Sequence, residues 1–240
     1  MTMNEKFDAA DERNPEAVAL FGAIWEGLEK ELGADALKFP KEIFWLNGAP
    51  GAGKGTQTGT ILEALGYAAE PVVMSDLLQT PEMRAIKAAG GLVGDKEVIS
   101  LLFRRLVRPE YRDGVLVDGF PRTAGQVACL KLLKKKLDAL HAAAPEKFAK
   151  PSFNILMLFV TEHESVERQL KRGREMQAKG LPVRETDVDP EKTRTRYRVF
   201  AEQTLRPLES LKGAFPYFHI DSVGTIEEIS AFIRRTLSAR

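Results

Sequence analysis

Residues 48–56 combine glycines, a lysine and a threonine in a spacing that can bind a polyphosphate. They read Gly-Ala-Pro-Gly-Ala-Gly-Lys-Gly-Thr and directly follow the apolar run 43–46. A loop between a strand and a helix points several backbone N–H groups into one concavity, where the helix dipole also favours an anion. Glycines let this backbone approach phosphate oxygens closely. We expect Lys54 to lie across the outer phosphates and Thr56 to offer its hydroxyl to Mg²⁺. A bound polyphosphate would then contact Gly51, Ala52, Gly53, Lys54, Gly55 and Thr56.

A second segment with chemical potential follows the apolar run 115–117. It reads Asp118-Gly119-Phe120-Pro121-Arg122-Thr123. A carboxylate at a strand's end beside a phosphate-binding loop can hold water on Mg²⁺, and an arginine just past a rigid Phe-Pro turn can bind a phosphate through two hydrogen bonds. Asp118 is therefore a candidate metal ligand through water, and Arg122 is a candidate phosphate ligand.

Arginines gather late in the chain. Arg168 and Arg172 are four residues apart on one helical face, and Arg194, Arg196 and Arg198 follow the segment 180–189. Transfer of a phosphoryl group requires that charge on several oxygens be neutralised as it shifts, which positioned arginines do without proton chemistry. For any single arginine, an ion pair on a solvated helix face is the alternative.

Five apolar segments predict the strands that would position these residues. They are separated by helical patterns, as in a parallel sheet with helices on both faces. The carboxyl ends of parallel strands share one edge of the sheet, where ligands of open α/β sheets bind. The predicted fold class is therefore α/β with a five-stranded parallel sheet, and the expected strands are 43–46, 71–74, 115–118, 153–160 and 217–221.

Composition excludes several classes of protein. The chain has 240 residues, 44% of them hydrophobic and 29% charged, which suits one soluble α/β domain with small insertions. Its net charge of +1 offers no general attraction for nucleic acid or anionic membrane. The single cysteine, Cys129, excludes an internal disulfide and a multi-cysteine zinc cluster. Without a signal peptide or an apolar run of roughly 20 residues, a cytoplasmic protein is expected.

An additional helix is predicted ahead of the first strand. Asn14 can cap it, Pro15 suits its first position, and apolar residues recur at spacings of three and four. We expect this helix, within an N-terminal extension of residues 1–40, to lie on the flank of the main domain, residues 41–240. The protein is expected to be a monomer, and association through this helix is the alternative. Its expected apolar residues are Val18, Phe21, Trp25, Leu28 and Leu32.

The two motifs together resemble the adenylate kinase and nucleoside monophosphate kinase family. Gly55 stands between Lys54 and Thr56, as in the family's Gly-x-Pro-Gly-x-Gly-Lys-Gly-Thr, and Asp-Gly-Phe-Pro-Arg follows in the right order. The resemblance implies a P-loop NTPase fold with a monophosphate-binding insertion at about 75–94 and a short lid at about 173–189 that lacks zinc. It also implies reversible phosphoryl transfer from MgATP to a nucleoside monophosphate, AMP first (ATP + AMP = 2 ADP).

The same resemblance implies roles for individual residues on the acceptor side. Arg122 would bind the phosphate of the monophosphate and Gln126 its base, beside Gly119, Phe120 and Pro121. Glutamine at this place is similar to the AMP-using members, whereas UMP/CMP kinases usually carry asparagine. An amide matches both the donor and the acceptor of the adenine edge.

On the donor side, Arg168 would cover the ATP base and Arg172 would contact its phosphates. Arg196 would lie near the transferred group, because Arg196-x-x-x-Phe200-x-x-x-Thr204 resembles the family's Arg-x-x-x-Tyr-x-x-x-Thr. Arg184 and Asp187 resemble the lid's Arg-x-Asp-Asp, although the spacing differs by one residue and Val188 replaces the second aspartate. The implied catalytic residues are Lys54, Arg122, Arg172, Arg184 and Arg196.

The chain departs from the family pattern in the monophosphate-binding segment. Met74 stands where a small hydroxyl residue usually faces the base, and Gln79 stands where an arginine usually grips the monophosphate. Arg84 is a candidate substitute, and Gly91, Leu92 and Val93 would complete the segment. These departures leave open a kinase for UMP, CMP or another small phosphate acceptor. A nucleotide-binding regulatory protein without efficient transfer is a further alternative.

Overall fold

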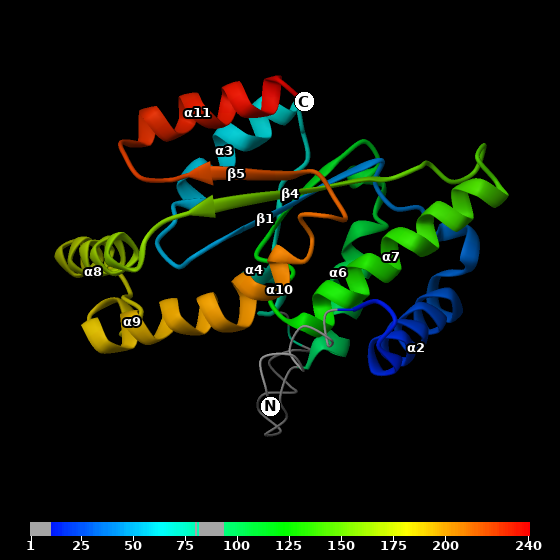
Figure 1. The fold of residues 1–240 in the computed structure, drawn as a ribbon, viewed down its shortest axis with the longest axis horizontal. Coiled ribbons are helices and arrows are strands. Elements are labelled where there is room, and N and C mark those ends of the chain that lie inside the picture. Colours follow the sequence, from blue (N-terminus) through cyan, green and yellow to red (C-terminus); the bar gives the residue numbers. More distant parts are fainter. Residues whose placement is uncertain (1–10, 80, 82–93) are drawn as a thin grey trace.

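The computed structural model describes residues 11–79, 81 and 94–240, which are built around a parallel sheet (Figure 1). The strand order is β2-β3-β1-β4-β5 and every pairing is parallel. The predicted α/β fold class with five parallel strands is confirmed. The strands are β1 (Glu42–Gly48), β2 (Val72–Val73), β3 (Val115–Asp118), β4 (Ser152–Phe159) and β5 (Tyr217–Asp221).

The second strand is shorter than the sequence predicted. Residues 71–74 were expected to be extended, but only Val72 and Val73 pair with β3, and Met74 begins the short helix α4 (Met74–Leu77). β2 lies at the edge of the sheet and has β3 as its neighbour. Because β3 ends at Asp118 and Gly119 turns away with a φ of 88°, Met74 has no ladder partner. The strand prediction for Met74 was therefore wrong.

Helices cover both faces of the sheet (Figure 1). One face carries α3 (Lys54–Leu65) and α11 (Ile226–Ser238), and the other carries α2 (Pro15–Leu32), α6 (Asp95–Leu106) and α7 (Ala124–Ala143). Side chains of β1 alternate between the two apolar cores, with Phe44 and Leu46 on the α3 side and Ile43 and Trp45 on the α7 side. This alternation is what a strand buried on both faces requires.

Helix α2 forms as predicted and lies on the flank of the domain. Oδ1 of Asn14 accepts hydrogen bonds from the backbone N–H groups of Glu16 and Ala17 at 2.9 and 3.3 Å. Its buried stripe belongs to the same core as β1 and α7, and consists of Phe21, Ile24, Trp25 and Leu28. Val18 and Leu32, which fit the same apolar spacing, are 48% and 38% exposed. The apolar stripe that contacts α6 and α7 therefore includes fewer of the regularly spaced apolar residues than the sequence pattern contains.

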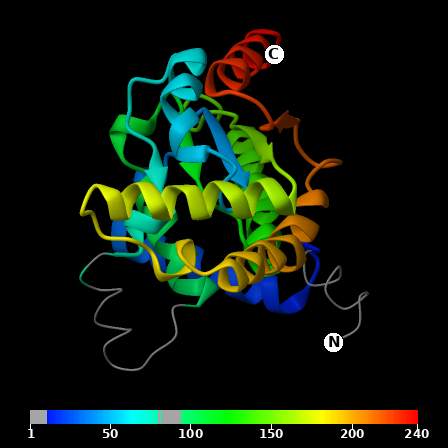
Figure 2. The same cartoon turned by 90° about the vertical axis from the view of Figure 1, so that its left-hand side faces the viewer.

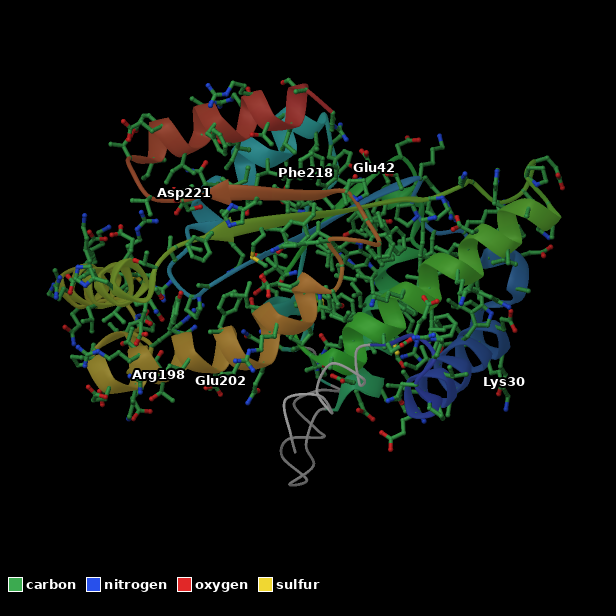
Figure 3. All side chains as sticks on the ribbon, in the orientation of Figure 1. Lys30, Glu42, Arg198, Glu202, Phe218 and Asp221 are labelled. Atoms are coloured by element: carbon green, nitrogen blue, oxygen red, sulfur yellow. The ribbon has the colours of Figure 1, made fainter. Side chains whose placement is uncertain are left out.

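The carboxyl edge of the sheet is bordered by α8 (Glu162–Ala178) and α9 (Pro190–Val199). In Figure 1 the arrowheads of β4 and β5 point toward α8, and Figure 2 shows α8 crossing in front of the sheet. Asp221 lies at this edge and Glu42 at the opposite one (Figure 3). Among the described residues, no helix is long and apolar enough to cross a membrane. The remaining short elements are η1 (Ala34–Ala36), η2 (Pro109–Tyr111), η3 (Glu185–Asp187), the π-helical turn η4 (Phe200–Leu205) and α10 (Arg206–Glu209).

Candidate active site

A cavity of about 1630 Å³ opens at the carboxyl edge of the sheet. Its lining comes from the loop between β1 and α3, the ends of β2 and β3, helix α8 and the segment 184–204. Most residues predicted for the site meet here, although they are distant in sequence. Those that line the cavity are Gly51, Ala52, Gly53, Lys54, Gly55, Thr56, Asp118, Gly119, Arg122, Arg168, Arg172, Arg184 and Arg196.

The loop between β1 and α3 adopts a conformation that needs glycine. Gly51 has a φ of 79°, and a Cβ on it would lie 2.8 Å from the carbonyl oxygen of Ser165. Gly53 has a φ of 84° and directly precedes the first residue of α3. The hydroxyl of Ser165 donates to the carbonyl of Pro50 at 2.6 Å, which attaches the loop to α8. The N-terminus of α3 is therefore presented to the cavity with its backbone N–H groups free for an anion.

Lys54 is the first residue of α3 and folds back over the loop. Its Nζ donates to the carbonyl of Gly48 at 2.7 Å. Burial lowers the pKa of Lys54 to about 8; the Asp118 carboxylate opposes this shift, and the nearby Arg122, Arg196 and Arg172 add to it. A protonated lysine among arginines is stabilised by a bound polyanion. The electrostatics of the loop thus favour phosphate.

Asp118 ends β3 beside Leu46 of β1. Its Oδ1 is buried and has no hydrogen-bond partner. Burial raises the pKa of this carboxyl group, Lys54 and Arg122 oppose the rise, and Asp76 adds to it. Water on a hydrated divalent cation would satisfy the unpartnered oxygen, and the Thr56 hydroxyl lines the same cavity. These residues fit hydrated Mg²⁺. Asp76 was not predicted as a site residue, and its only signal was its position after the second strand.

Phe120 and Pro121 support the acceptor side without lining the cavity. Phe120 is fully buried with its ring centroid 5.5 Å from that of Trp45, and its carbonyl accepts from Nδ2 of Asn47 at 2.8 Å. The Arg122 guanidinium donates through Nε to the carbonyl of Gly119 at 2.6 Å. The carbonyl of Arg122 accepts from the Thr204 hydroxyl at 2.9 Å. Contacts from β1 and η4 therefore fix the backbone that carries Arg122.

Asp187 joins two of the predicted catalytic arginines. Its side chain is 3% exposed, and its carboxylate oxygens lie 2.6 Å from Nη2 of Arg172 and 3.3 Å from Nη1 of Arg196. Gly173 of α8 permits this approach, because a Cβ there would lie 2.1 Å from the carbonyl oxygen of Asp187. Arg168 is held separately, by Glu164 at 2.6 Å and by the carbonyl of Ser222 at 2.8 Å. Contacts within the protein thus orient these arginines.

Three predicted acceptor-side residues do not reach the cavity surface. Met74 is 1% exposed and packs in the apolar core, whereas its neighbours Val73 and Ser75 line the cavity. Gln79 is exposed at the end of α4 and is not part of the lining. Gln126 is 5% exposed, with both ends of its amide bonded inside the protein. The predicted Gly91, Leu92 and Val93, together with Arg84, lie outside the described residues.

One part of the cavity was not predicted residue by residue. Gly224, Thr225 and Ile226 line it next to Arg168 and lead into α11, whose first turn Thr225 caps by accepting from the N–H of Glu228 at 3.2 Å. Ile226 is 55% exposed. The position after the fifth strand was the only sequence signal for this segment.

Comparison with known proteins agrees with the geometry. A family model described as an AAA domain matches residues 47–180. The chain is 35% identical to an adenylate kinase of Azorhizobium caulinodans over 205 residues, which cover 78% of this chain and 94% of that protein. It is 33% identical to an adenylate kinase of Xanthobacter autotrophicus over 208 residues, which cover 80% and 96%. A third adenylate kinase, from Beijerinckia indica, is 31% identical over 210 residues, covering 81% and 98%. The chain therefore belongs to the adenylate kinase family, and it is a nucleoside monophosphate kinase.

Proposed function

We propose that this enzyme transfers the γ-phosphoryl group of MgATP reversibly to AMP, giving two molecules of ADP. The observation that carries the proposal is the convergence of the Lys54 loop and Arg122 on one cavity, which Arg172 and Arg196, both paired with Asp187, also line. The loop would bind the polyphosphate of the donor, and the separate Arg122 would bind the phosphate of the acceptor. The relatives named adenylate kinase support AMP as the acceptor.

The donor would occupy the side of the cavity formed by α3, α8 and α11. Backbone N–H groups at residues 53–56 and the Lys54 ammonium would hold its β- and γ-phosphates. Arg168 and the segment 224–226 would border the base. Thr56, and Asp118 through water, would hold Mg²⁺, which neutralises charge on the phosphate oxygens when it is bound.

Catalysis by this arrangement needs little proton chemistry. The acceptor phosphate is already a nucleophile, so the protein has to place it in line and neutralise the shifting charge. Arg122 would hold the acceptor, and Arg172, Arg184 and Arg196 would surround the transferred group. The monophosphate-binding segment at about 75–94 and the lid at about 173–189 would close around both nucleotides to exclude water.

The two departures from the family pattern bear differently on the alternatives left open by the sequence. Met74 packs in the core, so like Gln126 it would reach a base only after a rearrangement. The substitution at Gln79 concerns the phosphate of the acceptor rather than the base.

A coupled assay for ADP tests the proposal. MgATP is presented with AMP, UMP, CMP, GMP and dTMP in turn, with and without a chelator of Mg²⁺. We expect the highest kcat/KM with AMP and loss of turnover without Mg²⁺. Preference for UMP or CMP would overturn AMP as the acceptor, and nucleotide binding without turnover would favour the regulatory alternative. Lys54→Met should abolish turnover, whereas the control Lys171→Met, at a cavity-lining side chain that is 72% exposed, should retain it.

A further inference from the structure

A small hydrogen-bond network joins the first turns of α6 and α7. The carboxylate of Asp95, the first residue of α6, accepts from the Thr123 hydroxyl through Oδ2 at 2.7 Å and from Nε2 of Gln126 through Oδ1 at 2.8 Å. The backbone N–H of Arg122 donates to Oε1 of Gln126 at 2.8 Å. Because Gln126 is 5% exposed, protein groups rather than water hold both ends of its amide.

These two partners allow only one orientation of the Gln126 amide. A carboxylate offers acceptors and a backbone N–H offers a donor, so Nε2 must face Asp95 and Oε1 must face Arg122. Rotating the amide by half a turn would set N–H against N–H and oxygen against oxygen. Both hydrogen bonds would be lost in a buried site, where unsatisfied polar groups are most unfavourable.

We propose that Asp95 is a positioning residue that fixes the orientation of the Gln126 amide and thereby selects adenine over oxopurine bases. The inference rests on the proposed function, because it takes AMP as the acceptor and Gln126 as the residue that contacts its base. Gln126 lies one hydrogen bond from the backbone of Arg122, which lines the cavity. Access for a base requires a rearrangement beside the first turn of α7, since the amide is buried.

The chemistry of the purines makes amide orientation a means of selection. Each amide that is engaged once at oxygen and once at nitrogen keeps one lone pair and one N–H. Adenine presents a donor at N6 and an acceptor at N1, whereas hypoxanthine presents an acceptor at O6 and a donor at N1. An amide fixed in the orientation that pairs with adenine therefore places its oxygen against O6 and its N–H against N1–H of hypoxanthine. Only the rotated amide pairs with hypoxanthine.

The test compares AMP with IMP, whose bases have nearly the same shape. Asp95→Asn keeps the shape of the side chain but can present either a donor or an acceptor to Gln126, so the rotated amide is then opposed only by the backbone N–H of Arg122. We expect the ratio of kcat/KM for AMP to that for IMP to fall about tenfold, the weight of one charged hydrogen bond. The loss should appear mainly as a higher KM for AMP, with the KM for ATP unchanged.

Two further variants separate base selection from stability. Thr123→Val removes the other hydrogen bond to Asp95. It also removes the cap of α7, in which the Thr123 hydroxyl accepts from the N–H of Gln126 at 3.1 Å. The hydrogen bond between the Gln126 amide and Asp95 is retained. It should lower the melting temperature without changing the AMP:IMP ratio. Gln126→Ala should reduce the ratio by itself, and adding Asp95→Asn to it should change the ratio no further.

Each outcome has a distinct meaning. An enzyme that forms no ADP from AMP removes the proposed function, and the inference falls with it. If the enzyme uses AMP and Gln126→Ala lowers the AMP:IMP ratio of kcat/KM but Asp95→Asn does not, the inference about Asp95 is wrong while the proposed function stands. An equal loss of kcat/KM for AMP and IMP in Asp95→Asn would show a merely structural role, and would also overturn the inference.

Discussion

At the scale of single residues, the cavity gathers more positive charge than the free protein can neutralise. Arg172 and Arg196 share the Asp187 carboxylate. Lys54 and Arg122 likewise interact with a single carboxylate, that of Asp118. Charges held close together in a partly buried site raise the free energy of the empty enzyme. Phosphate oxygens neutralise these charges, so relief of the repulsion contributes to the binding free energy of a nucleotide.

The depressed pKa of Lys54 predicts a pH dependence of stability. Its pKa is about 8 in the folded protein, against 10.5 for an unperturbed lysine, so between these limits the unfolded chain binds more protons. The free energy of unfolding should therefore rise from about pH 8 to about pH 10.5 and then level off, by on the order of 1–3 kcal/mol. This rise is measured by urea unfolding of the nucleotide-free enzyme and of Lys54→Met at several pH values. Other titrating groups, such as Cys129, are common to both proteins and cancel in the difference.

Parallel curves for the two proteins over this window would contradict the assignment. The same variant should lower kcat by at least about a hundredfold, because it removes a preorganised charge at the transferred group. An unchanged kcat would exclude Lys54 from the reaction.

Replacing Arg122 by lysine tests its contact with the acceptor. Lysine keeps the charge but cannot make two parallel hydrogen bonds, and it loses the bond from Nε to Gly119. We expect KM for AMP to rise about ten- to a hundredfold, the effect of losing 1.5–3 kcal/mol of charged hydrogen bonding. KM for ATP should stay constant. The matched control is Arg198→Lys at an arginine that is 63% exposed. An equal rise in both KM values would place Arg122 outside the acceptor subsite.

At the scale of elements, local patterns predicted the strands well because each contains a run of mostly apolar residues. β3 and β5 begin and end where the sequence indicated, and the chemistry-bearing residues at their exits meet at one edge. Met74 and Gln126 could not be placed in the same way. Whether Met74 continues a strand depends on where β3 ends, and whether Gln126 reaches the cavity depends on Asp95, 31 positions earlier. Such long-range partners leave no periodic signal.

The short element η3 depends on a glycine in another helix. A Cβ at Gly173 of α8 would lie 2.1 Å from the carbonyl oxygen of Asp187, which is backbone and cannot rotate away. Gly173→Ala should therefore displace Asp187, and with it Arg172 and Arg196, and lower kcat up to about a hundredfold through misplacement of about 1 Å. Steady-state kinetics and the melting temperature are the measurements.

Gly27→Ala is the matched control for this prediction. Gly27 is also helical, and nothing lies within 4 Å of the Cβ that the substitution adds. It should leave kcat unchanged and raise stability by about 0.5–1 kcal/mol, the helix propensity of alanine over glycine. If Gly173→Ala behaves like this control, the close approach of Asp187 to α8 is not needed for catalysis.

At the scale of the whole molecule, α2 completes one of the two layers that cover the sheet. It lies against α6 and α7 on the face opposite α3 and α11 (Figure 1), and it contributes no residue to the cavity lining. Ion pairs from Glu31 to Arg104 of α6 at 2.6 Å and from Glu12 to Lys135 of α7 at 2.8 Å border its buried stripe. Lys30, by contrast, points away from the molecule (Figure 3). The buried stripe of α2 belongs to the same apolar core as β1 and α7.

A substitution in this stripe distinguishes an integral helix from an appendage. Trp25 is 4% exposed and stacks on Phe21 and Phe39 with ring centroids 5.9 and 6.1 Å apart. Trp25→Ala should lower the free energy of unfolding by about 3–5 kcal/mol, because it leaves a cavity in the core. For a domain of this size that is a fall in Tm of on the order of 10 °C. Below the transition, kcat should stay within about twofold of wild type, since α2 is remote from the cavity. Val18→Ala, on the same helix but 48% exposed, should change stability by less than about 0.5 kcal/mol. Equal unfolding midpoints for the two variants would mean that α2 rests on the domain without stabilising it.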